Sequence, residues 1–77
     1  MSPKLPVVSG LDCIRALEKI GYKRIRQKGS HIRLKDMNGK LSPLTVPDHK
    51  ELRPGLLKKI LKDADLEVER FIELLTK

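Results

Sequence analysis

The sequence is short of cysteine, of long apolar runs and of aromatic residues. It has one cysteine in 77 residues, Cys13, so an internal disulfide is impossible and a cysteine-based metal site is excluded. We expect Cys13 to be a small, half-buried apolar residue of a helix. No stretch approaches the roughly 18 apolar residues that a membrane span needs. Residues 1–8 lack the apolar run of a signal peptide, which leads us to expect a cytoplasmic protein.

The scarcity of aromatic and paired acidic side chains narrows the functional classes further. Tyr22 and Phe71 are the only aromatic residues, so binding of nucleic acid by stacking bases on aromatic platforms is not expected. Asp36 and Asp48 are the first acids after the most basic segment, and neither has an acidic neighbour at a useful spacing. Two-metal nucleases hold their ions with acidic ligands, so we expect no metal site and no cofactor.

Positive charge is what the sequence has in excess. It contains 17 basic and 10 acidic residues, a net charge of +7. Residues 1–62 carry 15 basic and 5 acidic side chains, whereas residues 63–77 carry 2 basic and 5 acidic ones. A basic body with an acidic C-terminal end suggests a polyanionic partner. A charged surface that only keeps the protein in solution is the alternative.

The N-terminal half predicts a helix followed by three strands. Residues 1–8, with two prolines, form an extended tail that looks unstructured. Ser9 can cap a helix of about 11 residues that ends near Gly21, because apolar residues recur at helical spacing between them. Extended runs follow at 22–28, 31–37 and 40–46, and Asn38-Gly39 predicts a hairpin between the last two. Pro43 makes the third strand an edge at that point or delays its start.

The C-terminal part predicts two more helices. Pro54 suits the first turn of one helix, although Arg53 is a poor cap. Asp65 can cap a short third helix. Their apolar stripes are Leu57, Ile60, Leu61 and Ala64 in one and Val68, Phe71, Ile72 and Leu75 in the other. The sequence therefore predicts a two-layer α+β fold, with a three-stranded antiparallel sheet packed on helices and residues 9–77 forming one domain.

The first two predicted strands carry a basic cluster. Six basic residues and no acid lie between Tyr22 and Lys35, namely Lys23, Arg24, Arg26, Lys28, Arg33 and Lys35. About half of them must share one face, and such a cluster favours binding of a phosphate backbone. If Ile32 and Leu34 face the core, His31, Arg33 and Lys35 share the opposite face. The pattern does not tell which way the basic side chains of the first strand point.

His31 is the candidate for chemistry within this cluster. It follows Gly29-Ser30 directly and begins the central strand. A histidine can take a proton from a ribose 2′-OH or give one to the leaving 5′ oxygen. The alternatives are an exposed strand histidine without a role and, for Ser30, a residue that only turns the chain. His49, after Pro47, can equally be a plain loop histidine.

Three stretches of the sequence resemble the HicA toxin family. GYKRIRQKGSHIRL is similar to the family's aromatic and Gly-Ser-His pattern. TVPDHKELRPGLLKKIL looks like its Val-Pro-x-His loop and following helix, and LEVERFIELL is similar to an extension in one branch. The sequence departs from the family at Tyr22, where Trp or Phe is common, and at Leu56, where Thr is common.

The resemblance implies a fold like that of double-stranded-RNA-binding domains, with the order α-β-β-β-α, and a toxin of a type II toxin–antitoxin pair. It also implies an mRNA endonuclease whose catalytic histidine is His31, with a HicB-type antitoxin covering the His31 face. We therefore expect metal-independent RNA cleavage. The expected RNA-binding residues are Arg24, Arg26, Lys28, Gly29, Ser30, Arg33, Lys35 and His49.

Two rival functions remain open from the sequence. One is a non-catalytic RNA-binding module of the same fold, in which His31 only contacts RNA and affinity depends on salt. The other is a protein-interaction domain whose basic face meets an acidic partner.

Overall fold

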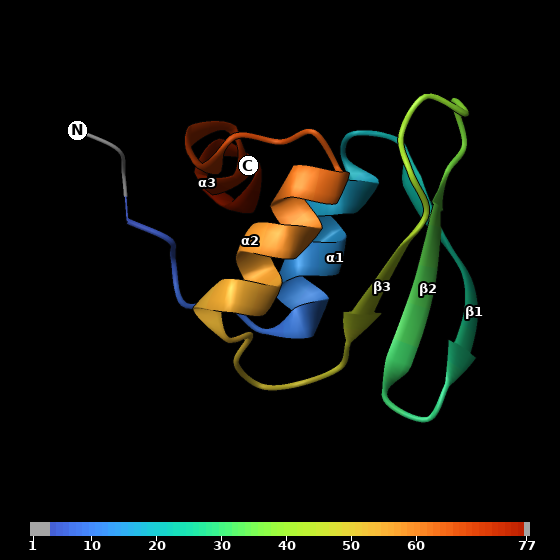
Figure 1. The fold of residues 1–77 in the computed structure, drawn as a ribbon, viewed down its shortest axis with the longest axis horizontal. Helices are drawn as coiled ribbons and strands as arrows, with labels where there is room; N and C mark the ends of the chain where they lie inside the picture. Colours follow the sequence, from blue (N-terminus) through green and yellow to red (C-terminus); the bar gives the residue numbers. More distant parts are fainter. Residues whose placement is uncertain (1–3, 77) are drawn as a thin grey trace.

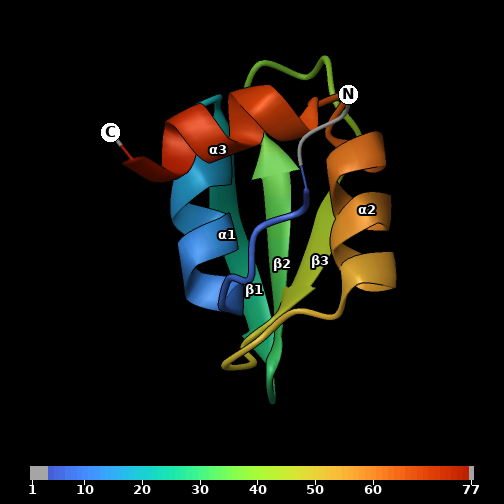
Figure 2. The same ribbon diagram turned by 90° about the vertical axis from the view of Figure 1, so that its left-hand side faces the viewer.

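The computed structural model describes residues 4–76 and has the predicted α+β fold. The elements in chain order are α1 (Gly10–Glu18), β1 (Tyr22–Lys28), β2 (His31–Asp36), β3 (Leu44–Pro47), α2 (Pro54–Asp63) and α3 (Val68–Thr76). The strands form an antiparallel sheet in the order β1-β2-β3. All three helices lie on one side of this sheet (Figures 1 and 2), so its other face stays uncovered. The arrangement is the expected α-β-β-β-α order with α3 added.

The start of α1 is built as the sequence predicts. The Ser9 side chain accepts a hydrogen bond from the backbone N–H of Asp12 at 3.0 Å and so caps the helix. The helix has 9 residues rather than about 11, because Lys19 already forms its C-cap. The chain then turns through Gly21, whose φ of +112° favours glycine.

The core lies between the helices and the inner face of the sheet. Phe71, Ile14, Leu17, Ile32, Leu34, Leu57, Val46 and Cys13 are its largest fully buried side chains. Cys13 is completely buried rather than half-buried, and burial raises the pKa of its thiol to about 12. The expectation of partial exposure was wrong, because Cys13 is part of the common core of buried residues.

The predicted N-terminal tail reaches the core. Residues 4–9 have no regular secondary structure, yet Val8 is buried and its carbonyl accepts a hydrogen bond from Leu52 N at 2.8 Å. Figure 2 shows this segment running between α1 and α2. Residues 1–3 of the predicted tail, like Lys77 of the predicted domain, lie outside the described residues. No helix within residues 4–76 is long and apolar enough to cross a membrane.

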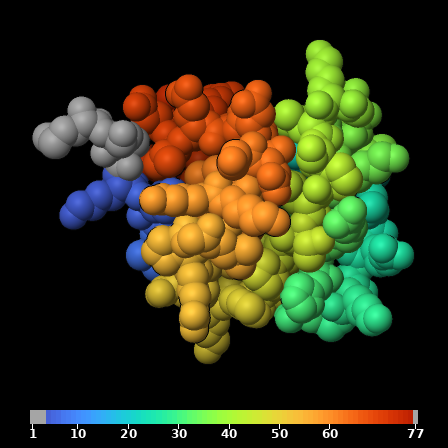
Figure 3. Space-filling view, viewed as in Figure 1, coloured from blue at the N-terminus to red at the C-terminus, as the bar shows by residue number. Residues whose placement is uncertain are grey.

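The connection between β2 and β3 differs from the predicted Asn-Gly hairpin. The last paired residues are Leu34 and Leu44, so β3 begins after Pro43, as the sequence allows. A loop of residues 37–43 replaces the first half of the expected third strand and projects from the molecule (Figure 3). The Asp36 carboxylate organises this loop by accepting backbone hydrogen bonds, which compete with a tight two-residue turn.

The two C-terminal helices confirm one expectation and correct another. Arg53 precedes α2 without a side-chain capping bond, and Pro54 opens the helix. Asp65 does not cap α3, because it has a φ of +51° in the turn that ends α2 and α3 begins only at Val68. Phe71 and Leu74 are the buried residues of α3.

Candidate nucleic-acid interface

The face of the sheet that the helices leave uncovered is basic. Directly paired residues of adjacent strands point to the same face, so the register assigns side chains to faces. Ile32 and Leu34 are buried toward the helices, which places the alternate residues of β2 on the other side. This outer face consists of Lys23, Arg26, Lys28, His31, Arg33, Lys35 and Thr45. None of its residues is acidic.

A β-bulge at Ile25 brings the cations of β1 to the outer face. Simple alternation from the buried Tyr22 would turn Arg26 and Lys28 toward the helices. The register instead shifts between Arg24 and Arg26, which leaves Ile25 as an extra residue with 51% of its surface exposed. Such a bulge reverses the alternation beyond it, so Arg26 and Lys28 join the face of His31.

The turn between β1 and β2 fixes the position of His31. Lys28 and His31 pair directly, so the turn consists of Gly29 and Ser30 alone. Gly29 has a φ of +58°, the left-handed conformation that favours glycine at the first position of a tight hairpin turn. The turn thereby sets His31 as the first residue of β2, with a lysine as its cross-strand neighbour.

A hollow of about 520 Å³ opens on the outer face beside His31. It is lined by Arg26, Gln27, Lys28, His31, Arg33 and Thr45. His31 is exposed, whereas Arg33 is half-buried and its Nη1 donates a hydrogen bond to Thr45 Oγ1 at 3.1 Å. This bond ties the guanidinium to β3, so a cation in a defined place borders the hollow.

The hollow combines two chemical abilities. Arginine and lysine side chains bind phosphate oxygens through charge-assisted hydrogen bonds. A histidine can transfer protons near neutral pH. Since no acidic side chain lines the hollow, an entering anion meets only attraction from it. Among residues 4–76, no group of three His, Cys, Asp or Glu side chains could hold a metal ion.

Five predicted contact residues lie outside the hollow. Lys35 is on the outer face but two residues beyond Arg33, where it pairs with Lys23. Arg24 keeps the inner-face orientation, and its Nε lies 3.7 Å from the Glu18 carboxylate of α1.

The other three belong to the end of the sheet, namely Gly29, Ser30 and His49. Ser30 is exposed in the turn, and its carbonyl oxygen accepts a hydrogen bond from Asp48 N at 2.6 Å. His49 is exposed in the loop that follows β3.

Two residues of the hollow, Gln27 and Thr45, were not singled out from the sequence. Alternation with Leu44 and Val46, both buried, would have placed Thr45 on the outer face. Gln27 carried no such signal, and the register pairs it with the buried Ile32. Its Nε2 donates to the carbonyl of Gly29 at 2.9 Å and so supports the turn.

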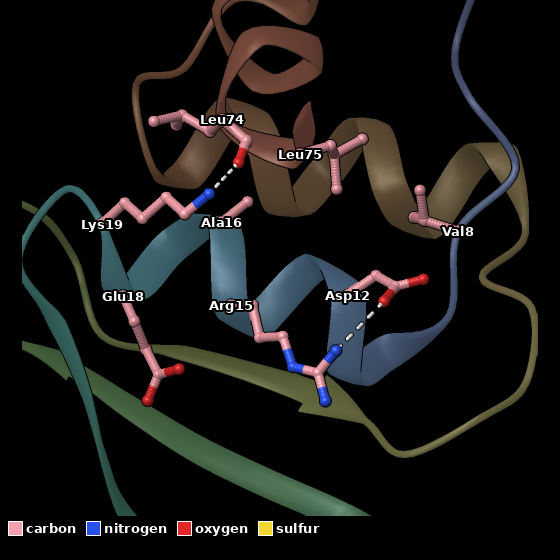
Figure 4. Close-up of a pocket in the computed structure, with 8 residues that line it drawn as sticks. All are labelled: Val8, Asp12, Arg15, Ala16, Glu18, Lys19, Leu74 and Leu75. Carbon is pink, nitrogen blue, oxygen red and sulfur yellow. Dashed lines mark hydrogen bonds and ion pairs between the residues drawn. The ribbon is translucent and has the colours of Figure 1, made fainter. Parts of the chain in front are cut away.

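A second hollow, of about 580 Å³, lies between α1 and α3 on the helical side. Its apolar lining comes from Val8, Ala16, Leu74 and Leu75 (Figure 4). Its charged rim is already engaged: Lys19 Nζ donates to the Leu74 carbonyl, and Arg15 Nη1 lies 3.9 Å from the Asp12 carboxylate. Neither histidine of the chain lines it, so its size alone does not make it the candidate site.

Comparison with known families decides the classification. A family profile described as the HicA toxin of bacterial toxin–antitoxin systems matches residues 10–66, which is most of the chain. The chain belongs to the HicA toxin family. Membership makes this HicA-family chain a toxin with an antitoxin as its partner. No curated protein and no solved structure matches the chain.

The match covers the whole candidate interface of this HicA-family toxin. It begins at the first residue of α1 and includes the sheet, the loop with His49 and all of α2. Helix α3 lies beyond it, although α3 contributes Phe71 to the core. The basic outer face is therefore part of the family domain, and α3 is an addition on the opposite side of the sheet (Figure 1).

Proposed function

We propose that this HicA-family toxin is an endoribonuclease that cuts mRNA without a metal ion and uses His31 as a general acid or base. One observation carries the proposal: His31 is exposed beside a hollow that three cations, and no acid, line. RNA supplies its own nucleophile in the 2′-OH, so the protein has to position the phosphate, move protons and stabilise negative charge.

The residues of the hollow divide this work between them. Arg26, Lys28 and Arg33 hold the scissile phosphate and stabilise the charge that develops on it during attack. His31 exchanges a proton with the 2′ oxygen or with the leaving 5′ oxygen. Lys35 extends the basic track along β2, where it binds a neighbouring phosphate.

The turn and the remaining predicted contacts complete the interface. Gly29 and Ser30 let the RNA backbone approach His31 closely, since both are small and exposed. For Arg24, binding to RNA stays a prediction, because its guanidinium is near Glu18 on the helical side.

The partner of the proposed nuclease follows from the same surface. A HicB-type antitoxin that covers the His31 face would exclude RNA and shield the basic cluster. Substrate and antitoxin would then compete for one site in the cytoplasm, where mRNA is found.

The deciding experiment compares wild type with His31→Ala on a labelled single-stranded RNA in the presence of EDTA. We expect cleavage by wild type and a loss of at least about 100-fold in His31→Ala, since positioned proton transfer contributes roughly 10²–10⁴-fold. RNA affinity and melting temperature should change little, because His31 is exposed. The matched control is the substitution Glu69→Gln, at an exposed residue of α3.

Other outcomes point to the rival functions. Cleavage by His31→Ala at the wild-type rate contradicts the assignment of this residue. Salt-dependent binding without cleavage by either protein indicates an RNA-binding module. The absence of RNA affinity at moderate salt favours an acidic protein as the only ligand of the basic face.

A further inference from the structure

The two histidines of the chain lie at the same end of the sheet. His31 begins β2 and pairs directly with Pro47, the last residue of β3, and His49 follows two residues later. Paired Cα atoms of antiparallel strands are about 5 Å apart and each residue adds at most about 3.5 Å, so the two histidine Cα atoms are separated by roughly 12 Å at most. Figures 1 and 2 both show the β1–β2 turn and the loop after β3 at this end.

The loop that carries His49 is held on two sides. Asp48 N donates to the Ser30 carbonyl at 2.6 Å, which continues the β2–β3 register by one residue past Pro47. Gly10 N, at the start of α1, donates to the His49 carbonyl at 2.8 Å. Gly10 permits this close approach, because a Cβ there would overlap the Pro47 carbonyl oxygen.

The turn beside His31 is open. Gly29, its first residue, has no side chain. A Cβ placed on Gly29 would meet nothing within 4 Å. Both histidines are exposed, so a phosphodiester laid across the turn is accessible to both.

The proposed reaction has two proton transfers, which either one group makes in turn or two groups divide between them. One group removes the proton of the 2′-OH while the 2′ oxygen bonds to phosphorus, and another gives a proton to the 5′ oxygen as the P–O5′ bond breaks. The products are a 2′,3′-cyclic phosphate and a 5′-hydroxyl. The other ionisable groups of the hollow are arginines and a lysine, which act as donors rather than as bases at neutral pH.

We propose that His49 is this second group, acting as the acid–base partner of His31 across the Gly29-Ser30 turn. The inference rests on the proposed nuclease function and deepens it. His49 is then a catalytic residue rather than only an RNA contact. The exposure of His49 fits this role, because its imidazole has to regain its starting protonation state from solvent after each turnover.

Several charged groups surround His49 and shape any pH profile of the reaction. Its own loop supplies Asp48, Lys50 and Glu51. The turn bonded to that loop is flanked by Lys28 and His31, and the first turn of α1 contains Asp12. The matched control is therefore Lys50→Gln, which changes a charge in the same loop and keeps both imidazoles.

The test measures kcat against pH for wild type, His31→Gln, His49→Gln and Lys50→Gln. Two RNAs with one mapped cleavage site are compared, one natural and one with sulfur in place of the leaving 5′ oxygen. A thiolate leaves without protonation, so this RNA does not need the acid. We expect a bell-shaped profile in wild type and Lys50→Gln, with one limb lost in each histidine variant.

The expected losses distinguish catalysis from binding. Each histidine variant should lower kcat at least about 100-fold on the natural RNA with little change in KM. The sulfur substrate should restore one of the two histidine variants and not the other. Cleavage by His49→Ala with added imidazole provides a second measurement of the role of this side chain. Neither His49→Gln nor His49→Ala removes the hydrogen bond from Gly10 N, because the carbonyl of the main chain accepts it.

The contrary results are equally distinct. If His49→Gln raises only KM, or keeps both limbs of the profile, His49 is an RNA contact and the proposal is wrong. If the sulfur substrate restores both histidine variants or neither, the two residues do not take opposite roles. If wild type cuts neither RNA, the proposed nuclease function itself fails, and the inference about His49 fails with it.

Discussion

At the scale of single residues, Asp36 shows how one carboxylate shapes the surroundings of the basic face. Its side chain is 2% exposed and accepts backbone hydrogen bonds from Asn38, Leu41 and Lys40 at 2.8–3.0 Å. These bonds, with that from Asn38 the largest contribution, hold the pKa of the Asp36 carboxyl below its usual value. The charged carboxylate thus stabilises the 37–43 loop, which leads into β3.

The substitution Asp36→Asn should lower the melting temperature at neutral pH, because an amide accepts these backbone bonds more weakly than a carboxylate. A carboxyl with a depressed folded-state pKa stabilises the protein above its ordinary pKa of 3.8 and loses that effect as the pH falls through the folded-state pKa. The gap in melting temperature between wild type and variant should therefore be full at pH 7 and close under strong acid. Thermal unfolding over this pH range measures it. A gap that does not depend on pH would show that the carboxylate charge is not what matters.

Tyr22, which pairs with Asp36, also connects the sheet to the 37–43 loop. Its hydroxyl donates to the Ser42 carbonyl at 2.7 Å, so the side chain spans from the start of β1 to the end of the loop. Burial, with the charges of Asp36 and Asp63, raises the pKa of the Tyr22 phenol. The phenol consequently stays a neutral donor, and the sequence departure from Trp or Phe at this position adds a hydrogen bond to the core.

At the scale of elements, the bulge in β1 decides which cations lie on the outer face of the sheet. The pattern of β2 was readable from the sequence, because Ile32 and Leu34 alternate with polar residues and prove to be buried. The pattern of β1 was not, since a bulge is a property of strand pairing and basic residues on both faces give no alternation to read. The Asn38-Gly39 turn was misjudged for a related reason: a local turn preference lost to the bonds of a buried carboxylate.

Deleting Ile25 tests this account of β1. The deletion removes the extra residue and leaves a regular ladder in which Tyr22 stays in the core while Arg26 and Lys28 keep the outer face. We expect RNA affinity within about threefold of wild type and a stability change within roughly 1 kcal/mol, because Ile25 is half exposed. Binding titrations and thermal unfolding check both quantities. Strong loss of RNA affinity in a folded deletion variant would mean that the twist of the bulge, rather than the assignment of faces, shapes the interface.

At the scale of the whole molecule, the fold separates a basic face from an acidic end. No acidic residue lies on the outer face of the sheet, whereas exposed Glu69 and Glu73 lie on α3 in the helical layer. The uneven charge along the sequence predicted a basic body and an acidic C-terminal end. It did not predict that the basic face and the acidic helix lie on opposite sides of the sheet. The buried Phe71 ties α3 to the core, so the acidic residues of α3 are fixed away from the outer face of the sheet. The acidic residues of α3 therefore do not repel a polyanion that approaches the face with His31.

This separation predicts how RNA affinity depends on salt. The outer face offers five cations besides His31, and a single-stranded RNA that engages all of them should give a slope of log K against log salt of roughly −3.5. Arg33→Ala should make the slope less steep by about 0.7, because one phosphate contact is lost, whereas Glu69→Gln on α3 should leave it unchanged. Titrations from about 50 to 200 mM salt measure both. A slope near zero in wild type, or an equal change in the α3 variant, would place RNA elsewhere than on the sheet, since screening acts on the charges that the RNA meets.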